Sequence, residues 1–176
     1  MLTDISIVIP TYNEKENIDL IFNAIRKSLN SISWEIIFVD DNSPDNTAAF
    51  VNAISKTNTN VRCIKRIGKR GLSSACIEGI LASSSKYVAI MDADMQHDEK
   101  ILPKMLNTIS QEKFNLVIGT RYSEQGSTGD LPAYRVLISK IATWIGTIFL
   151  KSNVSDPMSG FFIIEKDFFN RIEKKL

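Results

Sequence analysis

The chain alternates short apolar runs, rich in β-branched residues, with longer segments in which apolar residues recur at helical spacing. The apolar runs predict five strands, at residues 5–9, 35–39, 61–65, 87–91 and 115–119. The segments between them predict helices over residues 18–29, 45–55, 73–83 and 99–110. Strands that are apolar along nearly their whole length are typical of a parallel sheet covered on both faces. We therefore expect an α/β fold with a mainly parallel sheet flanked by helices.

Length and charge limit the classes of protein to which the chain can belong. Its 176 residues suffice for one domain with a hydrophobic core and are few for two. The 21 basic and 20 acidic residues leave a formal net charge of +1. Nucleic-acid binding is not expected, because it needs a basic excess gathered on one face.

Three features bear on where the protein acts. Cys63 and Cys76 fit neither a metal-ligand spacing nor a disulfide framework, so we expect reduced, buried thiols, compatible with the cytoplasm. Asp4 and Pro10 interrupt the N-terminal apolar run, and no signal peptide is expected. The apolar run at 141–150 has ten residues, whereas a membrane span takes about 20. A helix lying on a membrane surface remains open.

Polar residues follow three of the predicted strands, at the point where each strand ends. The first strand is followed by Thr-Tyr-Asn-Glu at 11–14, the second by Asp-Asp-Asn-Ser at 40–43 and the fourth by Asp-Ala-Asp at 92–94. Ligands of open parallel sheets bind beyond the carboxyl ends of the strands. The sequence therefore predicts one ligand site at this edge.

Asp92 and Asp94 suit a hard divalent cation such as Mg²⁺ or Mn²⁺, since carboxylates two residues apart in a turn can converge on one ion. An isolated Asp-x-Asp is more often a pair of solvated acids, and only the neighbouring polar segments favour a metal site. Gln96 can add a neutral oxygen. His97, the only histidine, is more often a packing or hydrogen-bonding residue than a ligand.

Other polar residues near the predicted strand ends have both a structural and a binding interpretation. Ser43 or Asp45 can cap the following helix, which leaves Asp41 free to accept hydrogen bonds from a base or ribose. Arg121 and Arg135 suit phosphate oxygens, although either alone is more often a surface ion-pair partner. Gly71 is best explained as a backbone requirement of its turn.

Taken together, these segments resemble glycosyltransferase family 2 and, within it, the dolichyl- or polyprenyl-phosphate sugar synthases. Each motif alone is weakly specific, but seven occur in the family's order across nearly the whole chain. They are residues 8–14 (VIPTYNE), 39–45 (VDDNSPD), 71–75 (GLSSA), 91–97 (MDADMQH), 119–122 (GTRY), Arg135 with Ser139, and 154–161 (VSDPMSGF).

The resemblance implies a GT-A fold: one domain over 1–176, with a nucleotide-binding half at 1–122. Residues 123–176 would then hold a flap loop, the apolar helix and the start of the acceptor region. It implies that Mg²⁺ or Mn²⁺ is held by Asp92, Asp94 and Gln96, and that Asp94, Arg121 and Arg135 act in catalysis. The implied nucleotide-sugar contacts are Pro10, Tyr12, Glu14, Val39, Asp41, Asp92, Ala93, Asp94 and Arg121.

The implied reaction moves mannose or glucose from GDP-mannose or UDP-glucose onto a polyprenyl phosphate, with inversion, at the cytoplasmic face of a membrane. Members that use hydroxyl acceptors place a Glu-Asp pair near the position of residues 156–161, and no Glu-Asp pair occurs in this chain. The chain ends at Leu176, where members of the family continue. The alternative is therefore a shortened, catalytically silent nucleotide-sugar-binding or interaction module, with a membrane or another chain covering its apolar surface.

Overall fold

A computed structural model describes residues 3–119 and 159–173 of the chain. Its strands are β1 Ile5–Thr11, β2 Trp34–Asp40, β3 Val61–Lys65, β4 Tyr87–Ile90, β5 Leu116–Ile118 and β6 Phe162–Glu165. Its helices are α1 Lys15–Ser28, α2 Thr47–Ser55, α3 Leu72–Ala82, the 3₁₀ turn η1 Glu99–Ile101, α4 Leu102–Gln111 and α6 Lys166–Glu173.

The six strands form one sheet in the order β3-β2-β1-β4-β6-β5. Strands β1 to β4 run parallel, whereas β6 lies antiparallel between β4 and β5. The predicted mainly parallel sheet is confirmed, and all five predicted strands are present. The sequence analysis did not predict β6. Its four residues pass directly into α6, and so short a run cannot be separated from a helix by periodicity.

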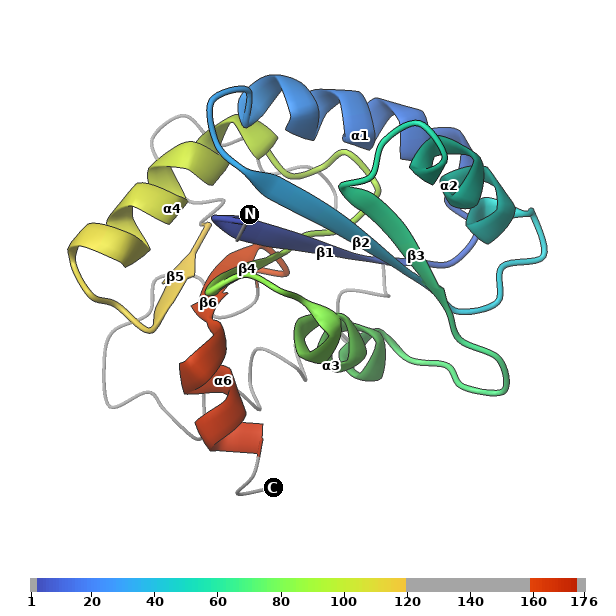
Figure 1. Ribbon diagram of the computed structural model, residues 1–176. Helices are drawn as coiled ribbons and strands as arrows, with labels where there is room; N and C mark the ends of the chain where they lie inside the picture. Colours follow the sequence, from blue (N-terminus) through green and yellow to red (C-terminus); the bar gives the residue numbers. More distant parts are fainter. Residues whose placement is uncertain (1–2, 120–158, 174–176) are drawn as a thin grey trace.

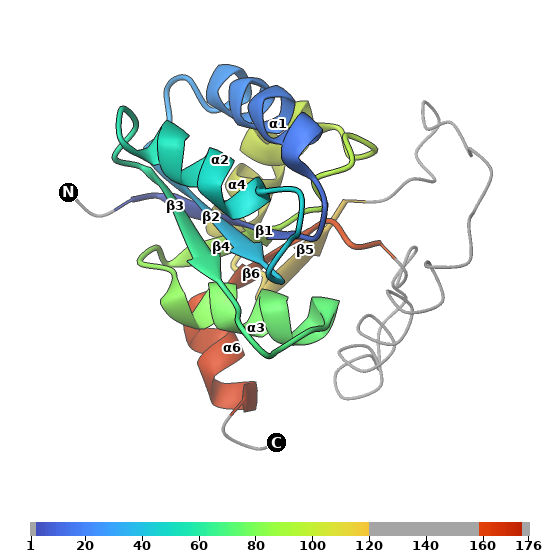
Figure 2. The same cartoon turned by 90° about the vertical axis from the view of Figure 1, so that its right-hand side faces the viewer.

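Helices cover both faces of the sheet, as predicted. Helices α1, α2 and α4 lie on one face, and α3 and α6 lie on the other (Figures 1 and 2). For α1, α2 and α3, right-handed crossovers explain the choice of face, because the chain moves outward from β1 to β3 and then returns to β4 on the far side of β1. Strand side chains alternate accordingly, so that Ile7 and Ile9 pack in the core beneath α1 whereas Val8 packs beneath α3.

The helix predicted over 99–110 divides into η1 and α4. Pro103 lies in the first turn of α4, where a helix needs no backbone N–H from that residue. Among the helices of residues 3–119 and 159–173, none is both long and apolar enough to cross a bilayer. The loop predicted at 123–130 and the apolar helix predicted at 141–150 lie outside the described residues.

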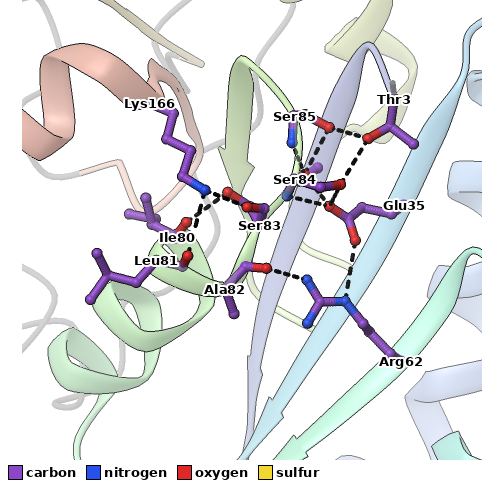
Figure 3. A network of polar contacts seen from close by, with 11 residues as sticks. Thr3, Glu35, Arg62, Ile80, Leu81, Ala82, Ser83, Ser84, Ser85 and Lys166 are labelled. Carbon is purple, nitrogen blue, oxygen red and sulfur yellow. Dashed lines mark hydrogen bonds and ion pairs between the residues drawn. The ribbon is translucent and has the colours of Figure 1, made fainter. Parts of the chain in front are cut away.

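A polar network closes the amino-terminal edge of the sheet (Figure 3). The buried Glu35 carboxylate accepts hydrogen bonds from Ser6 Oγ at 2.6 Å and from Ser84 N and Oγ at 2.8 and 2.7 Å. Arg62 Nε donates to the same carboxylate at 3.2 Å. Lys166 Nζ donates to the carbonyl of Ser83 and so ties the start of α6 to the C-terminal end of α3. The protein's own contacts hold this edge of the sheet together.

Candidate active site

The polar strand ends meet where the strand order reverses. The chain leaves β1 towards β2 and β3 and later returns to β4 on the other side of β1, which makes β1 and β4 the switch point where such sheets bind ligands. The antiparallel β6 brings its amino-terminal end to the same edge. There Gly119 N donates to Phe161 O at 2.8 Å. The edge is thus built from both parallel and antiparallel strands.

The Asp92–Asp94 segment turns sharply directly after β4. Ala93 is 3% exposed and anchors the segment in the core, while the flanking Asp92 and Asp94 are half-buried. Met95 has a φ of 60°, a left-handed conformation that is unfavourable for a bulky side chain. The turn lets Asp94 Oδ1 accept a hydrogen bond from Gln96 N at 3.0 Å. Such strain is typical of functional sites.

His97 contacts this turn through Asp92 and packs against Phe161. Its Nε2 lies 3.2 Å from Asp92 Oδ2, and its ring centroid lies 5.2 Å from that of Phe161. The sequence analysis favoured packing and hydrogen bonding over metal ligation for His97, and the structure shows both contacts. Phe161 thus links the end of β6 to the Asp92 turn.

Glu14 shares the negative field of the two aspartates. Burial raises the pKa of Glu14, the hydrogen bond from Asn17 Nδ2 at 2.7 Å opposes the rise, and the charges of Asp94, Asp92 and Asp45 add to it. Carboxylates from the ends of β1 and β4 therefore face a common region. Several carboxylates that face one region attract cations.

These side chains suit a hard divalent cation whose coordination shell is completed by a bound ligand. Among residues 3–119 and 159–173, no three His, Cys, Asp or Glu side chains are grouped closely enough to hold a metal ion. Mg²⁺ usually takes one or two protein carboxylates and fills its remaining positions with water and substrate phosphates. Asp92 and Asp94 supply such carboxylates, and their ligation of a metal together with Gln96 stays a prediction.

Two neighbouring aspartates at the end of β2 have different roles. Asp40 is fully buried and accepts hydrogen bonds from Ser43 N and Oγ, at 3.0 and 2.5 Å, so it holds the turn. Asp41 accepts from Arg66 Nη1 at 2.5 Å and from Gly71 N at 2.8 Å. The sequence analysis left Asp41 without protein partners, and it missed Arg66, whose only signal is an arginine directly after a strand. Each carboxylate oxygen of Asp41 can still accept one more bond.

The turn that follows β3 reaches across to the end of β1. Gly71 has a φ of 130°, which confirms that its turn requires a glycine. Arg70 Nη2 donates to the Tyr12 hydroxyl at 2.7 Å, and its guanidinium carbon lies 4.4 Å from the centre of the Tyr12 ring. Tyr12 is 42% exposed. An aromatic ring backed by a guanidinium thus stands at the surface of the site.

The loops after β1 and β2 are joined by hydrogen bonds. Lys15 N, at the start of α1, donates to Asp45 Oδ2 at 3.1 Å. Asp45 Oδ1 accepts from Thr47 N at 2.9 Å. Because α2 begins at Thr47, its N-cap residue is Asn46, so neither Ser43 nor Asp45 occupies the capping position predicted for it. Pro10 and Val39 lie opposite each other in β1 and β2, and the Val39 side chain is fully buried. Val39 therefore has only its backbone to offer a ligand.

Of the predicted site residues, the structure brings together the end of β1, the end of β2 and the Asp92 turn. Arg121 and Arg135 lie outside the described residues, as does Ser139. Their predicted roles stay predictions.

Comparisons with known proteins agree with this geometry. The family model of glycosyl transferase family 2 matches residues 6–173. Dolichol-phosphate mannosyltransferase of Pyrococcus furiosus is 39% identical over 171 residues, covering 96% of this chain and 48% of its own length. The Saccharomyces cerevisiae dolichol-phosphate mannosyltransferase is 37% identical over 172 residues, covering 96% of this chain and 63% of its own length. This chain therefore spans about half to two thirds of the length of these relatives.

Solved structures with the same fold include two sugar transferases. The mannosyltransferase PcManGT from Pyrobaculum calidifontis, solved with GDP-Man and Mn²⁺, has a TM-score of 0.68 at 16% identity and covers 98% of this chain and 47% of its own. Glucosyl-3-phosphoglycerate synthase from Mycobacterium tuberculosis has a TM-score of 0.65 at 18% identity and covers 94% of this chain and 57% of its own. These likenesses confirm the predicted GT-A fold. With the family match over residues 6–173, the chain belongs to glycosyltransferase family 2.

Proposed function

We propose that this chain transfers mannose from GDP-mannose to a polyprenyl phosphate, with inversion at the anomeric carbon. The observation that carries the proposal is that Glu14 follows β1 while Asp92 and Asp94 follow β4, its parallel neighbour, at the switch point of the sheet. The names of the relatives support mannose and a dolichol-type acceptor. UDP-glucose is the donor to test beside GDP-mannose, because the geometry of the described residues does not select a base.

The proposed donor site divides into a diphosphate part and a nucleoside part. Asp92, Asp94 and Gln96 would hold Mg²⁺ or Mn²⁺, which would offset the charge of the departing nucleoside diphosphate. In the nucleoside part, Tyr12 offers an exposed aromatic ring and Asp41 a fixed acceptor. Pro10, Glu14, Val39 and the backbone of Ala93 complete the proposed donor site, and Arg121 and Arg135 are proposed to face phosphates.

The chemistry of the acceptor explains why the site needs no dedicated base. A phosphate monoester has a second pKa of about 6 and is already anionic at neutral pH. A hydroxyl acceptor would need a base to remove its proton. Because a polyprenyl phosphate lies in a bilayer, we place the reaction at the cytoplasmic surface of a membrane, with the protein bound peripherally or through a partner.

The first test measures nucleotide binding through thermal unfolding. The protein is unfolded with GDP or with UDP, each with and without Mn²⁺. We expect metal-dependent stabilisation of the wild type and its loss in Asp94→Asn. Asp19→Asn is the matched control, because it removes the same charge from an exposed position on α1, and it should respond as the wild type does. Equal stabilisation of Asp94→Asn and wild type would place the diphosphate elsewhere.

The second test is transfer from radiolabelled GDP-mannose to a short polyprenyl phosphate in detergent. Product formation that depends on Asp94 supports the transferase. Metal-dependent GDP binding without product would support the alternative, a nucleotide-sugar-binding module that does not catalyse transfer.

A further inference from the structure

Arg66 is a buried cation, and each of its three side-chain nitrogens has a hydrogen-bond partner. Only 1% of its side chain is exposed. Nη1 donates to Asp41 Oδ1 at 2.5 Å and to Gly71 O at 3.2 Å, Nη2 donates to Ser74 Oγ at 2.5 Å, and Nε donates to Glu78 Oε2 at 3.1 Å. A buried guanidinium is strongly unfavourable unless it is paired and hydrogen-bonded. All three nitrogens have partners here, so these hydrogen bonds offset the cost of burying Arg66 and hold its side chain in position.

The contacts of Arg66 join three elements around the nucleoside part of the site. Asp41 follows β2, Gly71 ends the turn after β3, and Ser74 and Glu78 belong to α3. A planar guanidinium can hold several acceptors in fixed directions, which an ammonium group cannot do. Arg66 therefore fixes the distance between the end of β2 and the start of α3.

The same contacts fix the orientation of the Asp41 carboxylate. Oδ1 accepts from Arg66 and Oδ2 accepts from Gly71 N at 2.8 Å, while the Asp41 backbone N donates to Thr11 O at 3.0 Å. The side chain is still 13% exposed, and each oxygen retains a lone pair for a ligand donor. An acceptor that is already fixed loses little conformational entropy when a ligand binds.

We propose that Arg66 is a positioning residue for nucleoside recognition: it orients Asp41 and the Gly71 turn so that Asp41 accepts a hydrogen bond from the base or ribose, without touching the ligand itself. This inference rests on the proposed function. It predicts that loss of Arg66 weakens the nucleoside part of the site and leaves the diphosphate part intact.

The test compares two ligands on one variant. For Arg66→Lys, which keeps the charge and loses the planar group, we expect the Kd of GDP with Mn²⁺ to rise roughly 10- to 100-fold, the range for loss of one hydrogen bond to a charged group. The Kd of inorganic pyrophosphate with Mn²⁺ should stay unchanged, because pyrophosphate carries no nucleoside. Isothermal titration calorimetry measures both constants, and circular dichroism verifies that the variant is folded.

Arg62→Lys is the matched control. Arg62 lies on β3, the strand that Arg66 directly follows, but it bonds Glu35 and the carbonyl of Ala82 at the opposite edge of the sheet (Figure 3). This variant should be less stable than the wild type, but the ratio of its Kd for GDP to its Kd for pyrophosphate should not change. If Arg66 only stabilised the fold, both variants would bind GDP and pyrophosphate more weakly. A loss confined to GDP binding by Arg66→Lys therefore identifies a positioning role.

If Arg66→Lys does not fold, Ser74→Ala makes the same comparison, because it removes the partner of Arg66 Nη2 and the bond from Ser74 Oγ to Gly71 O, which hold the same turn. A smaller rise in the Kd of GDP, with the Kd of pyrophosphate unchanged, would support the inference. An unchanged Kd of GDP, or an equal loss for both ligands, in the folded variant would overturn it while the proposed function stands. If the wild type binds GDP no more tightly than pyrophosphate, the inference is overturned too. If the wild type binds neither ligand, both the inference and the proposed function are overturned.

Discussion

Replacement of Gly79 by alanine tests how tightly α3 packs on the sheet. Gly79 lies in the middle of α3 and faces β1 and β2. An added Cβ would lie closer to Cγ1 of Val8 than real Cβ atoms come to any neighbour, and 3.1 Å from Cγ2 of Val39. Carbon atoms normally pack at about 3.5–4.0 Å. Both valines are fully buried and β-branched, so neither can turn aside easily.

Two opposing effects set the size of the change. Alanine in a helix interior is favoured over glycine by about 1 kcal/mol. Overpacking of a core costs about 1–3 kcal/mol, and we expect the upper part of this range because the closest atom belongs to a stiff side chain. The net result for Gly79→Ala is a loss of about 1–2 kcal/mol, or about 2–8 °C in Tm for a chain of this size.

Urea and thermal unfolding, followed by circular dichroism, measure this difference. Ser73→Ala is the control, since it lies on the exposed side of the same helix and gains helix propensity without a clash. It should equal or slightly exceed the wild type in stability. If Gly79→Ala proved as stable as Ser73→Ala, then α3 would not lie against Val8 and Val39 as described, and the reasoning would be wrong.

Three further predictions concern other parts of the molecule. For Glu35, burial opposes ionisation, but hydrogen bonds from Ser6 and Ser84 and the charge of Arg62 outweigh it and lower the pKa below its ordinary value of 4.5; Glu35→Gln should therefore lose about 1.5–3 kcal/mol at pH 7. A group with a lowered folded pKa stabilises the protein above its unfolded pKa, so the difference from wild type should shrink in urea unfolding as the pH falls below 4.5. Burial raises the pKa of both cysteine thiols, Cys63 and Cys76, to about 12, so at pH 8 we expect both to react with a disulfide reagent far more slowly in the folded protein than in urea. Gly71→Ala would force a side chain into a φ of 130° and should cost about 1–3 kcal/mol by denaturant unfolding; an unchanged midpoint would show that the turn relaxes.

The local pattern of the sequence was enough to predict most of the fold. Burial on both faces leaves strands apolar throughout, and burial on one face leaves helices with apolar residues at a period of 3.6. Five strands, the coverage of both faces and the position of Asp92 and Asp94 after β4 follow from those patterns. The order of the seven motifs identified the family, because function requires the same residues at the same strand ends. A run as short as β6 carries no such period.

Tertiary structure decided which of these residues meet. Asp41 and Arg66 pair because parallel alignment of β2 and β3 brings the ends of both strands to one edge. Glu14 shares its field with Asp92 and Asp94 because β1 and β4 are neighbours, although about 80 residues separate them in the sequence. Local periodicity indicates which faces of a segment are buried. Strand pairing depends on packing between segments far apart in the chain. The sequence by itself therefore determined the elements and the chemistry at their ends, and the order of strands in the sheet determined how that chemistry is combined.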